Sequence, residues 1–498
     1  MTHANRLTRR HLLHGLLGAG ALGAAAATLG LRPGLARSGP RAGDDGLAER
    51  KLLFVVCATG GGNIIDSFLP VLDSEVKSGD AAALDVYPES LVLQPPGSKL
   101  RCVGALPDYS YYTSNFSMQT LLAHHYADMV VLAHECTSVN HAVAQKRAVT
   151  GAGVNFGRTI MEANAARHGA GLLLPNTNMA NGGYIAPGDD PELPRWARAE
   201  LIADPLMFAA STHGRRGIVG APAAGLVERA RAARSELEAA SPFGQTFAAS
   251  PLREVYLEQR DVSQPAIEAA DLISKLMLVP QSSLPAEYGL AASPILGPIS
   301  DAFPLLYRDA WEARAALAFA LAYFGVSCSV TVGLDFDPVA VDNALISTPL
   351  AFDYSHNDHR VAQNLMWGRT CRLVDGLITL LKTFDYLGDP ALGKMWDRSL
   401  VYVATDFGRE KVRPSGADTW GTGHHLNNGT LLISPLLKGN AVYGGVDPDT
   451  LLTYGFDRST GQPDPAAIMR EGDVYSAIAA ALGVEFEGRK EMSVVVRG

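Results

Sequence analysis

The run "LLFVVCATGGGN" at residues 52–63 decides how we expect this chain to fold. Its first six residues, Leu52–Cys57, are all apolar and leave no polar face, which is typical of a strand buried on both sides within a parallel sheet. The glycine triplet Gly60–Gly62 then predicts a tight turn at the end of that strand. The triplet matches neither of the common glycine-rich phosphate loops, so it does not indicate a nucleotide site.

Other short apolar runs repeat this pattern along the chain. They are "MVVLA" (129–133), "VSCSVTV" (326–332), "LVYVA" (400–404) and "TLLIS" (430–434). Between them lie stretches with apolar residues at helical spacing, such as 309–325 and the segment around Leu373, Leu377 and Leu381. Strands that alternate with helices predict an α/β domain with a doubly wound, mostly parallel sheet flanked by helices.

Residues 180–300 differ in composition from the rest. They are rich in Pro, Gly and Ala, with a helical pattern at 224–240 and no long strand pattern. We expect a helical and loop insertion within one α/β domain that spans 51–498, although a separate domain is an alternative. A polar linker at 39–50 precedes that domain.

The N-terminal residues 1–38 predict an export signal. A basic start is followed by an apolar run rich in Gly and Ala, Leu12–Leu31, and then by small residues. The pair Arg9 and Arg10 resembles a twin-arginine signal, which predicts passage through the twin-arginine translocase to the periplasm or the outside of the cell. A membrane anchor is the alternative, but the run is weakly apolar for a span, and we expect no other integral membrane segment.

Charge and cysteine content exclude some classes of protein. The net charge of −9 argues against a nucleic-acid partner, which requires a basic surface. The five cysteines are odd in number and form no C-x-x-C motif, so buried free thiols are favoured over a disulfide framework.

Polar side chains follow the ends of several predicted strands. In doubly wound sheets, ligands bind just beyond the carboxyl ends of the strands. The candidates at this edge are Asp66, Ser138, His141, Asp353, His356, Asp406, Arg409 and His424. Carboxylates and imidazoles that converge on one edge suit Zn²⁺ or a similar divalent ion, with Ca²⁺ or Mg²⁺ as alternatives.

Each candidate also has a plain structural interpretation. Asp353 and His356 could be the polar start of a helix, since acidic and polar residues are common there. His141 could be an ordinary hydrogen-bonded histidine, His424 a polar loop residue, and Arg409 part of a salt bridge. The case for a site therefore depends on the whole set.

These segments resemble a bacterial family catalogued as domain of unknown function 1501. The segments "LLFVVCATGGGN", "SVNHAVAQKRAVTG", "VTVGLDFD…FDYSHNDH", "VYVATDFGRE" and "GTGHHLNNGTLLISPLLKGNAVYGG" occur in the family's order, over residues 51–450. That family looks like a branch of the alkaline phosphatase and sulfatase superfamily. The resemblance therefore implies an alkaline-phosphatase-like version of the α/β fold.

The resemblance also implies roles for residues. Asp353 and His356 match the family's Asp-Thr-His, with one extra residue between them, and His424 matches the His of its Asp-His-Gly, where Gly423 replaces the Asp. These three would hold one metal ion. Asp66 and Asp406 would contribute to a second, weaker site.

Two departures from the motifs of these relatives weaken the case for a second metal site and for a nucleophile. Phe407 follows Asp406 where alkaline phosphatases have a histidine, so a second metal would lack its imidazole. His141 matches the His of the family's Ser-His segment, but Asn140 replaces the Ser. The candidate nucleophile is Ser138 or Thr137, just ahead of a helix whose backbone N–H groups could stabilise negative charge. Arg409 matches the family's Arg and would pair with an anionic substrate.

We therefore expect a metal-dependent phosphoesterase- or sulfatase-like hydrolase that acts on an anionic small-molecule or polymer ester. The alternative is an exported binding or assembly protein with a degenerate site of the same kind.

Overall fold

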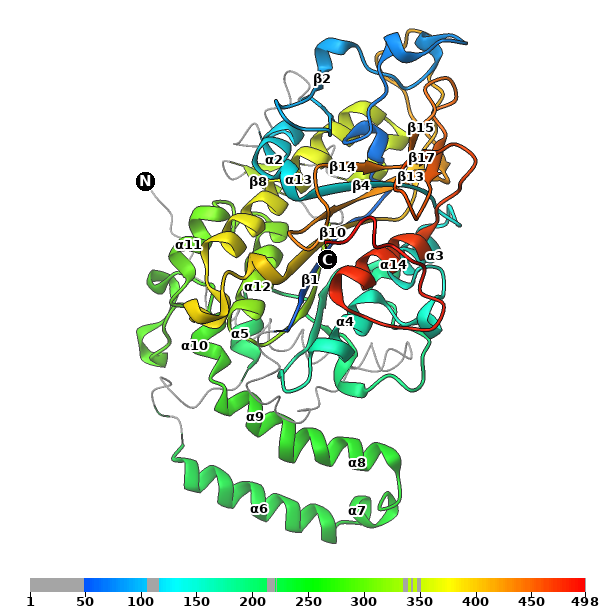
Figure 1. The fold of residues 1–498 in the computed structure, drawn as a ribbon. Coiled ribbons are helices and arrows are strands. Elements are labelled where there is room, and N and C mark those ends of the chain that lie inside the picture. The colour runs from blue at the N-terminus through cyan, green and yellow to red at the C-terminus, as the bar shows by residue number, and fades with distance from the viewer. Residues whose placement is uncertain are drawn as a thin grey trace.

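An eight-stranded sheet forms the centre of the molecule (Figure 1). The computed structural model describes residues 49–104, 116–212, 220, 222–334, 339–341, 344–346 and 351–497. In spatial order, the strands are β14 (Ala441–Tyr443), β4 (Met129–Glu135), β13 (Asn427–Ile433), β10 (Ser399–Thr405), β1 (Leu52–Ala58), β7 (Ser329–Leu334), β5 (Asn176–Met179) and β6 (Glu200–Leu201). The expected export signal and most of the linker lie outside the described residues.

The sheet is mostly parallel, as predicted. Every neighbouring pair is parallel except the two that involve β13, which runs antiparallel to both β10 and β4. All five apolar runs singled out in the sequence fall on strands. The α/β class with a mostly parallel sheet is therefore confirmed.

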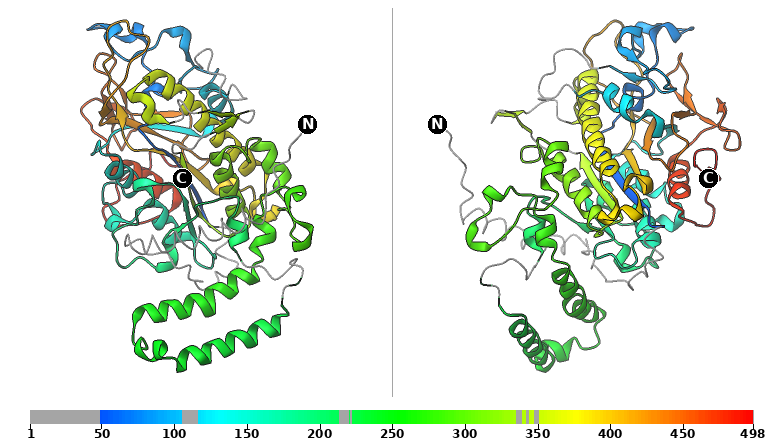
Figure 2. Two further views of the ribbon diagram at one scale, coloured as in Figure 1. Left: turned by 180° about the vertical axis from the view of Figure 1, so that it is seen from behind. Right: turned by 60° about the vertical axis from the view of Figure 1, so that its left-hand side comes forward.

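Helices cover both faces of the sheet (Figures 1 and 2). One face packs against α2 (Met118–His125), α12 (Ala310–Tyr323) and α13 (His359–Thr383), and the other against α3 (His141–Thr150), α4 (Ile160–His168) and α14 (Glu471–Leu482). In β1, Phe54 and Val56 point into the first core, whereas Leu53, Val55 and Cys57 point into the second. The uninterrupted apolar run follows from this burial on both sides.

The predicted insertion is only partly separate from the sheet. Its β6, α10 (Leu272–Leu276) and α11 (Leu296–Ala302) pack against the main body. The hairpin formed by α6 (Ala224–Ala240), α7 (Pro242–Thr246), α8 (Pro251–Glu258) and α9 (Gln264–Ala269) stands away from it (Figure 1).

Shorter elements complete the described chain. They are α5 (Phe208–Ser211), β2 (Val92–Leu93), β3 (Cys102–Val103), β8 (Val339–Val341), β9 (Ala344–Ile346), β11 (Gly408–Arg409), β12 (His424–His425), β15 (Gly445–Val446), β16 (Thr453–Phe456) and β17 (Pro463–Asp464). All five cysteines are buried and unpaired, as predicted. Among the described helices, none combines the length and the apolar character that crossing a membrane requires.

The register of the central strands defines one edge. Ala58 at the end of β1 pairs with Thr405 of β10 and with Leu334 of β7, so these strands end level. Glu135 at the end of β4 pairs with Asn427, the first residue of the antiparallel β13. The ends of β1, β4, β7 and β10 therefore lie at this edge.

Candidate functional site

The turn after β1 forms the floor of the candidate site. Gly60 and Gly61 have φ of +102° and +80°, which side chains rarely adopt. Their backbone N–H groups donate to the buried Asp406 carboxylate at 3.2 and 2.6 Å. A Cβ on Gly60 would lie 2.7 Å from the backbone N of Asp353. The glycines are therefore needed for the turn and for the close approach of the loop that carries Asp353.

His141, the first residue of α3, links Asp406 to Asp353. Asn140 caps this helix by accepting the Val143 N–H at 3.2 Å. The Nδ1–H of His141 donates to Asp406 Oδ2 at 2.7 Å, and its Nε2 lies 3.3 Å from Asp353 Oδ1. Hydrogen bonds with Asp353 and with Asp406 raise the pKa of His141 to about 9. Asp406 therefore orients His141 toward Asp353.

His424 on β12 and His356 meet the same carboxylate from the other side. The Nδ1–H of His424 donates to the Val139 carbonyl at 2.9 Å, and its Nε2 lies 2.9 Å from Nε2 of His356. His356 Nε2 is also 3.4 Å from Asp353 Oδ1. Burial lowers the pKa of His424 and favours its neutral form. Ligand atoms of His141, Asp353 and His424 lie within 4.8 Å of one another.

This donor set fits a divalent metal. A tetrahedral ion with bonds of about 2.0–2.1 Å holds its ligands about 3.3 Å apart. The separations of 3.3, 3.4 and 2.9 Å between neighbouring ligand atoms are close to that value. The group whose ligand atoms all lie within 4.8 Å of one another consists of His141, Asp353 and His424, and His356 lies beside it. Because the Nδ1 atoms of His141 and His424 are held by a carboxylate and a carbonyl, their Nε2 atoms are left to act as ligands, as in many zinc sites.

Arg409 is in a different position from the one expected for a residue that binds substrate. Its side chain is fully buried, and Nη2 donates to the Gly60 carbonyl, to Phe352 O at 3.4 Å and to Asp353 Oδ1 at 3.2 Å. Nη1 lies 3.3 Å from His356 Nε2. The guanidinium thus joins the turn after β1 to the loop that carries Asp353 and His356.

Ser138, the candidate nucleophile, lies in the turn before α3. Its Oγ accepts the Asn140 N–H at 3.1 Å. It directly precedes Val139, whose carbonyl holds His424. Ser138 is therefore adjacent in sequence to a residue that contacts the site, and its hydroxyl is hydrogen-bonded within the turn.

The expected ligand Asp66 belongs to a separate, buried cluster with Asp85 and His359. Nε2 of His359 lies 3.1 Å from Asp66 Oδ2 and 3.0 Å from Asp85 Oδ2. Burial lowers the pKa of His359, but the negative charges of Asp66 and Asp85 outweigh this effect and raise it to about 9. Tyr87 and Asn63 donate to Asp66. His359 begins α13, and its two ion pairs were not expected from the sequence.

The charges in this buried cluster already balance. Two carboxylates face the His359 imidazolium and Arg360, whose Nε donates to Asp85 Oδ1 at 3.4 Å. Lys411 lies close by, where its Nζ donates to Asn63 Oδ1 at 3.2 Å, and burial lowers its pKa to about 8. An added divalent ion would give this enclosed site excess positive charge, so we interpret the cluster as a structural ion network.

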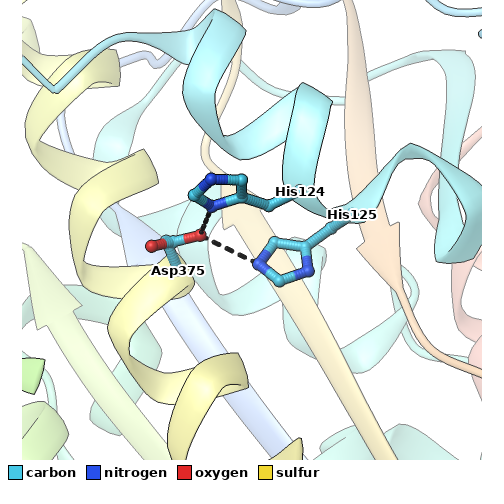
Figure 3. Close-up of side chains that lie close together, drawn as sticks. All are labelled: His124, His125 and Asp375. Carbon is cyan, nitrogen blue, oxygen red and sulfur yellow. Dashed lines mark hydrogen bonds and ion pairs between the residues drawn. The ribbon is translucent and has the colours of Figure 1, made fainter.

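A third grouping joins α2 to α13 (Figure 3). Nδ1 of His124 and Nε2 of His125 lie 2.8 and 2.9 Å from the same oxygen of Asp375. The Lys382 ammonium lies 3.1 Å from His125 Nδ1 and donates to it. The Nε2 of His125 therefore carries the proton that binds Asp375. This tautomer leaves no lone pair for a metal, so the grouping is a hydrogen-bonded link between two helices.

No family model and no curated protein matches the chain. The solved structures that it resembles include Ps i-CgsB in complex with k-i-k-neocarrahexaose, with a TM-score of 0.30 and 10% identity, over 89% of this chain and 74% of that one. The crystal structure of Ps i-CgsB without that ligand gives a TM-score of 0.29 at the same identity and coverage. Similarity at this level does not establish a shared fold.

Proposed function

We propose that the chain is an exported metal-dependent ester hydrolase with one divalent cation site, formed by His141, Asp353, His356 and His424. One observation carries the proposal. Two imidazole nitrogens, Nε2 of His356 and of His424, lie 2.9 Å apart beside a shared carboxylate, while the other nitrogen of His424 is tied to a backbone carbonyl. Such a pair of nitrogens requires a proton or a metal between them.

The donor set favours zinc. Three imidazoles and one carboxylate are nitrogen-rich, whereas Ca²⁺ and Mg²⁺ prefer oxygen ligands. A bound cation would polarise an ester oxygen or lower the pKa of a water molecule.

The surrounding residues would prepare this site for hydrolysis. Asp406 holds the ring of His141, and Arg409 holds Asp353, so both ligands are oriented by buried partners. Ser138, at the start of α3, is our candidate nucleophile once its hydroxyl leaves the turn.

An anionic phosphate or sulfate ester, small or polymeric, is the substrate class that we propose. The resemblance to the domain of unknown function 1501 and to alkaline phosphatases and sulfatases supports it, as does the twin-arginine pattern at the N-terminus for a location in the periplasm or beyond.

A second candidate is a non-catalytic binding or assembly protein. Phe407 is buried where a second metal would need an imidazole, and its ring packs against His141 and His424 with centroids 4.6 and 4.1 Å away. The buried Arg409 also supplies positive charge to Asp353 without a metal. These features favour a site with fewer catalytic groups than the site of a two-metal hydrolase has.

Elemental analysis of the purified protein tests the proposal. We expect about one equivalent of zinc per chain, and a loss of at least tenfold in zinc affinity in His424→Ala. His425→Ala is the matched control, because His425 is the next residue on β12 and its Nδ1 instead accepts the Asn427 N–H. Wild-type protein that takes up no divalent metal contradicts the proposal.

Aryl phosphate and aryl sulfate substrates then separate the two candidates. Hydrolysis that zinc supports and that His424→Ala lacks favours the hydrolase. Zinc binding without hydrolysis of either substrate favours the binding protein.

A further inference from the structure

Helix α6 exposes a face with the spacing of a helix-pairing seam. Its residues 226, 230, 233, 237 and 240 follow one another by four, three, four and three positions, the repeat of a coiled coil. They are Leu226, Ala230, Ala233, Leu237 and Ala240, and all are exposed. Leu226 and Leu237 keep 52% and 73% of their surface accessible, so both are available for contact with another helix.

The opposite face of α6 already has its partner within the chain. Val227, Arg231, Ser235 and Glu238 are partly buried. Arg231 pairs with Glu268 of α9 at 2.5 Å, and Arg260, just after α8, pairs with Glu238. These contacts hold the hairpin together. Figure 1 shows α6 as the helix of the hairpin that lies farthest from the sheet, and the five seam residues are all exposed.

The charged residues beside the seam can form ion pairs between two copies of α6. If two α6 helices lie antiparallel with Leu226 opposite Leu237, then Ala230 lies opposite Ala233 and residue 223 opposite residue 240. In that register, Arg229 of each helix lies beside Glu236 of the other. Both side chains are exposed. The arrangement therefore yields two equivalent ion pairs related by a twofold axis.

The seam suits a second helix better than a lipid surface. Helix α6 contains three arginines (229, 231 and 234) and three glutamates (228, 236 and 238), so it lacks the basic face of a membrane-surface helix. The alanines between the leucines allow the two helix axes to approach to about 8 Å, the lower end of the usual range.

We propose that a second copy of this chain docks on α6, and that the two helices form an antiparallel, twofold-symmetric pair. The interface is independent of the metal site and of its chemistry. Because one helix of 17 residues is only about 25 Å long, the dimer is expected to be weak and to depend on protein concentration.

Sedimentation of the full chain from about 1 to 100 µM, the range suited to a small interface, tests the proposal. We expect a shift from monomer to dimer, and a dissociation constant at least tenfold higher in Leu237→Glu. Arg229→Glu should weaken the dimer roughly threefold or more, and Arg229→Glu with Glu236→Arg should restore it. Glu228→Arg, on the exposed helix but outside the seam, is the matched control and should dimerise like wild type.

A chain that stays monomeric throughout, or a dimer that Leu237→Glu leaves unchanged, overturns the proposal. Because these side chains are exposed, the variants should keep the wild-type melting temperature. A variant that lowers it is replaced by Leu237→Lys, for which the same weakening is expected and a dimer of unchanged strength again overturns the proposal.

Cross-linking tests the antiparallel register. A mixture of Ala223→Cys chains and Ala240→Cys chains should form a disulfide-linked heterodimer, whereas each variant alone should not, because equal positions would lie about 25 Å apart. The five native cysteines are buried, so they should not interfere. Cross-linking of each variant with itself would instead show a parallel pair and overturn this register.

Discussion

The half-exposed cluster of His141, Asp353 and His424 and the buried cluster of Asp66, Asp85 and His359 are built from the same residue types, each within 4.8 Å. They differ in what surrounds them. In the first, a carboxylate and a carbonyl hold the outer nitrogens of the two imidazoles, so that the inner nitrogens face Asp353 and His356. In the second, Arg360 and His359 neutralise both carboxylates away from solvent. Residue types alone therefore do not distinguish a metal site from an ion network. The groups that contact those residues from outside the cluster do distinguish them.

The largest effect on stability should come from the buried cluster. His359→Ala leaves Asp66 and Asp85 without their shared partner in a fully buried site, and should lower the free energy of unfolding by about 3–5 kcal/mol. His424→Ala, in the half-exposed cluster, should cost less than about 1 kcal/mol. Denaturant unfolding measures both. Equal losses would contradict the division between a structural and a ligand-binding cluster.

Part of the pH dependence of stability should come from the buried cluster. The pKa of His359 is raised to about 9, so the folded state binds its proton more tightly than the unfolded state does. This stabilisation is complete below about pH 6.5 and is lost as the pH rises through about 9, a change of about 3 kcal/mol. Unfolding at several pH values should show a steeper slope in wild type than in His359→Gln, which keeps the contribution of His141, whose pKa is also raised to about 9. An equal slope in both proteins would assign it to other groups.

Asp406 should tune the half-exposed cluster without being a ligand. Asp406→Asn removes the charge that orients His141 but keeps an oxygen for the Gly61 N–H, so zinc affinity should fall about 10–100-fold. Competition with a chelator measures the affinity. Asp375→Asn changes a carboxylate beside two histidines elsewhere and should leave zinc affinity unchanged. Zinc affinity that Asp406→Asn does not alter would remove Asp406 from the site.

The smallest effect should come from the link between α2 and α13. His124 is exposed, so His124→Ala should cost less than about 1 kcal/mol of stability and should not change zinc binding. Thermal unfolding with and without zinc measures both quantities. A zinc-dependent rise in melting temperature that disappears in this variant would make the third grouping a metal site after all.

The sequence predicted the central strands well because they are apolar on both faces. It missed β5, where Asn176, Thr177 and Asn178 are buried in spite of their polarity. Asn176 donates to the Ala197 carbonyl and Asn178 to the Tyr184 carbonyl, and these partners come from later loops. A pattern of apolar residues could not predict the direction of β13 either, because the direction of a strand depends on which strands it pairs with.

The sequence indicated which residues after strand ends lie together, but not the contacts that backbone groups decide. Asp353, His356 and His424 were expected to lie together, and their ligand atoms do. Asp406 was expected as a metal ligand, but the N–H groups of a glycine turn and His141 hold it. Asp85 follows no strand pattern, so nothing in the sequence connected it to His359, which lies 274 positions away.

The reversed direction of β13 has a consequence for how this edge of the sheet can vary. The chain leaves the edge at Thr405 and returns to the same edge at Asn427, so the segment between them never crosses the sheet. That segment carries Asp406, Arg409 and His424. Insertions or deletions within it, away from these residues, would leave the strand register intact, because loop closure costs rise only slowly with length. The same sheet could thus carry a longer or shorter segment around the candidate site.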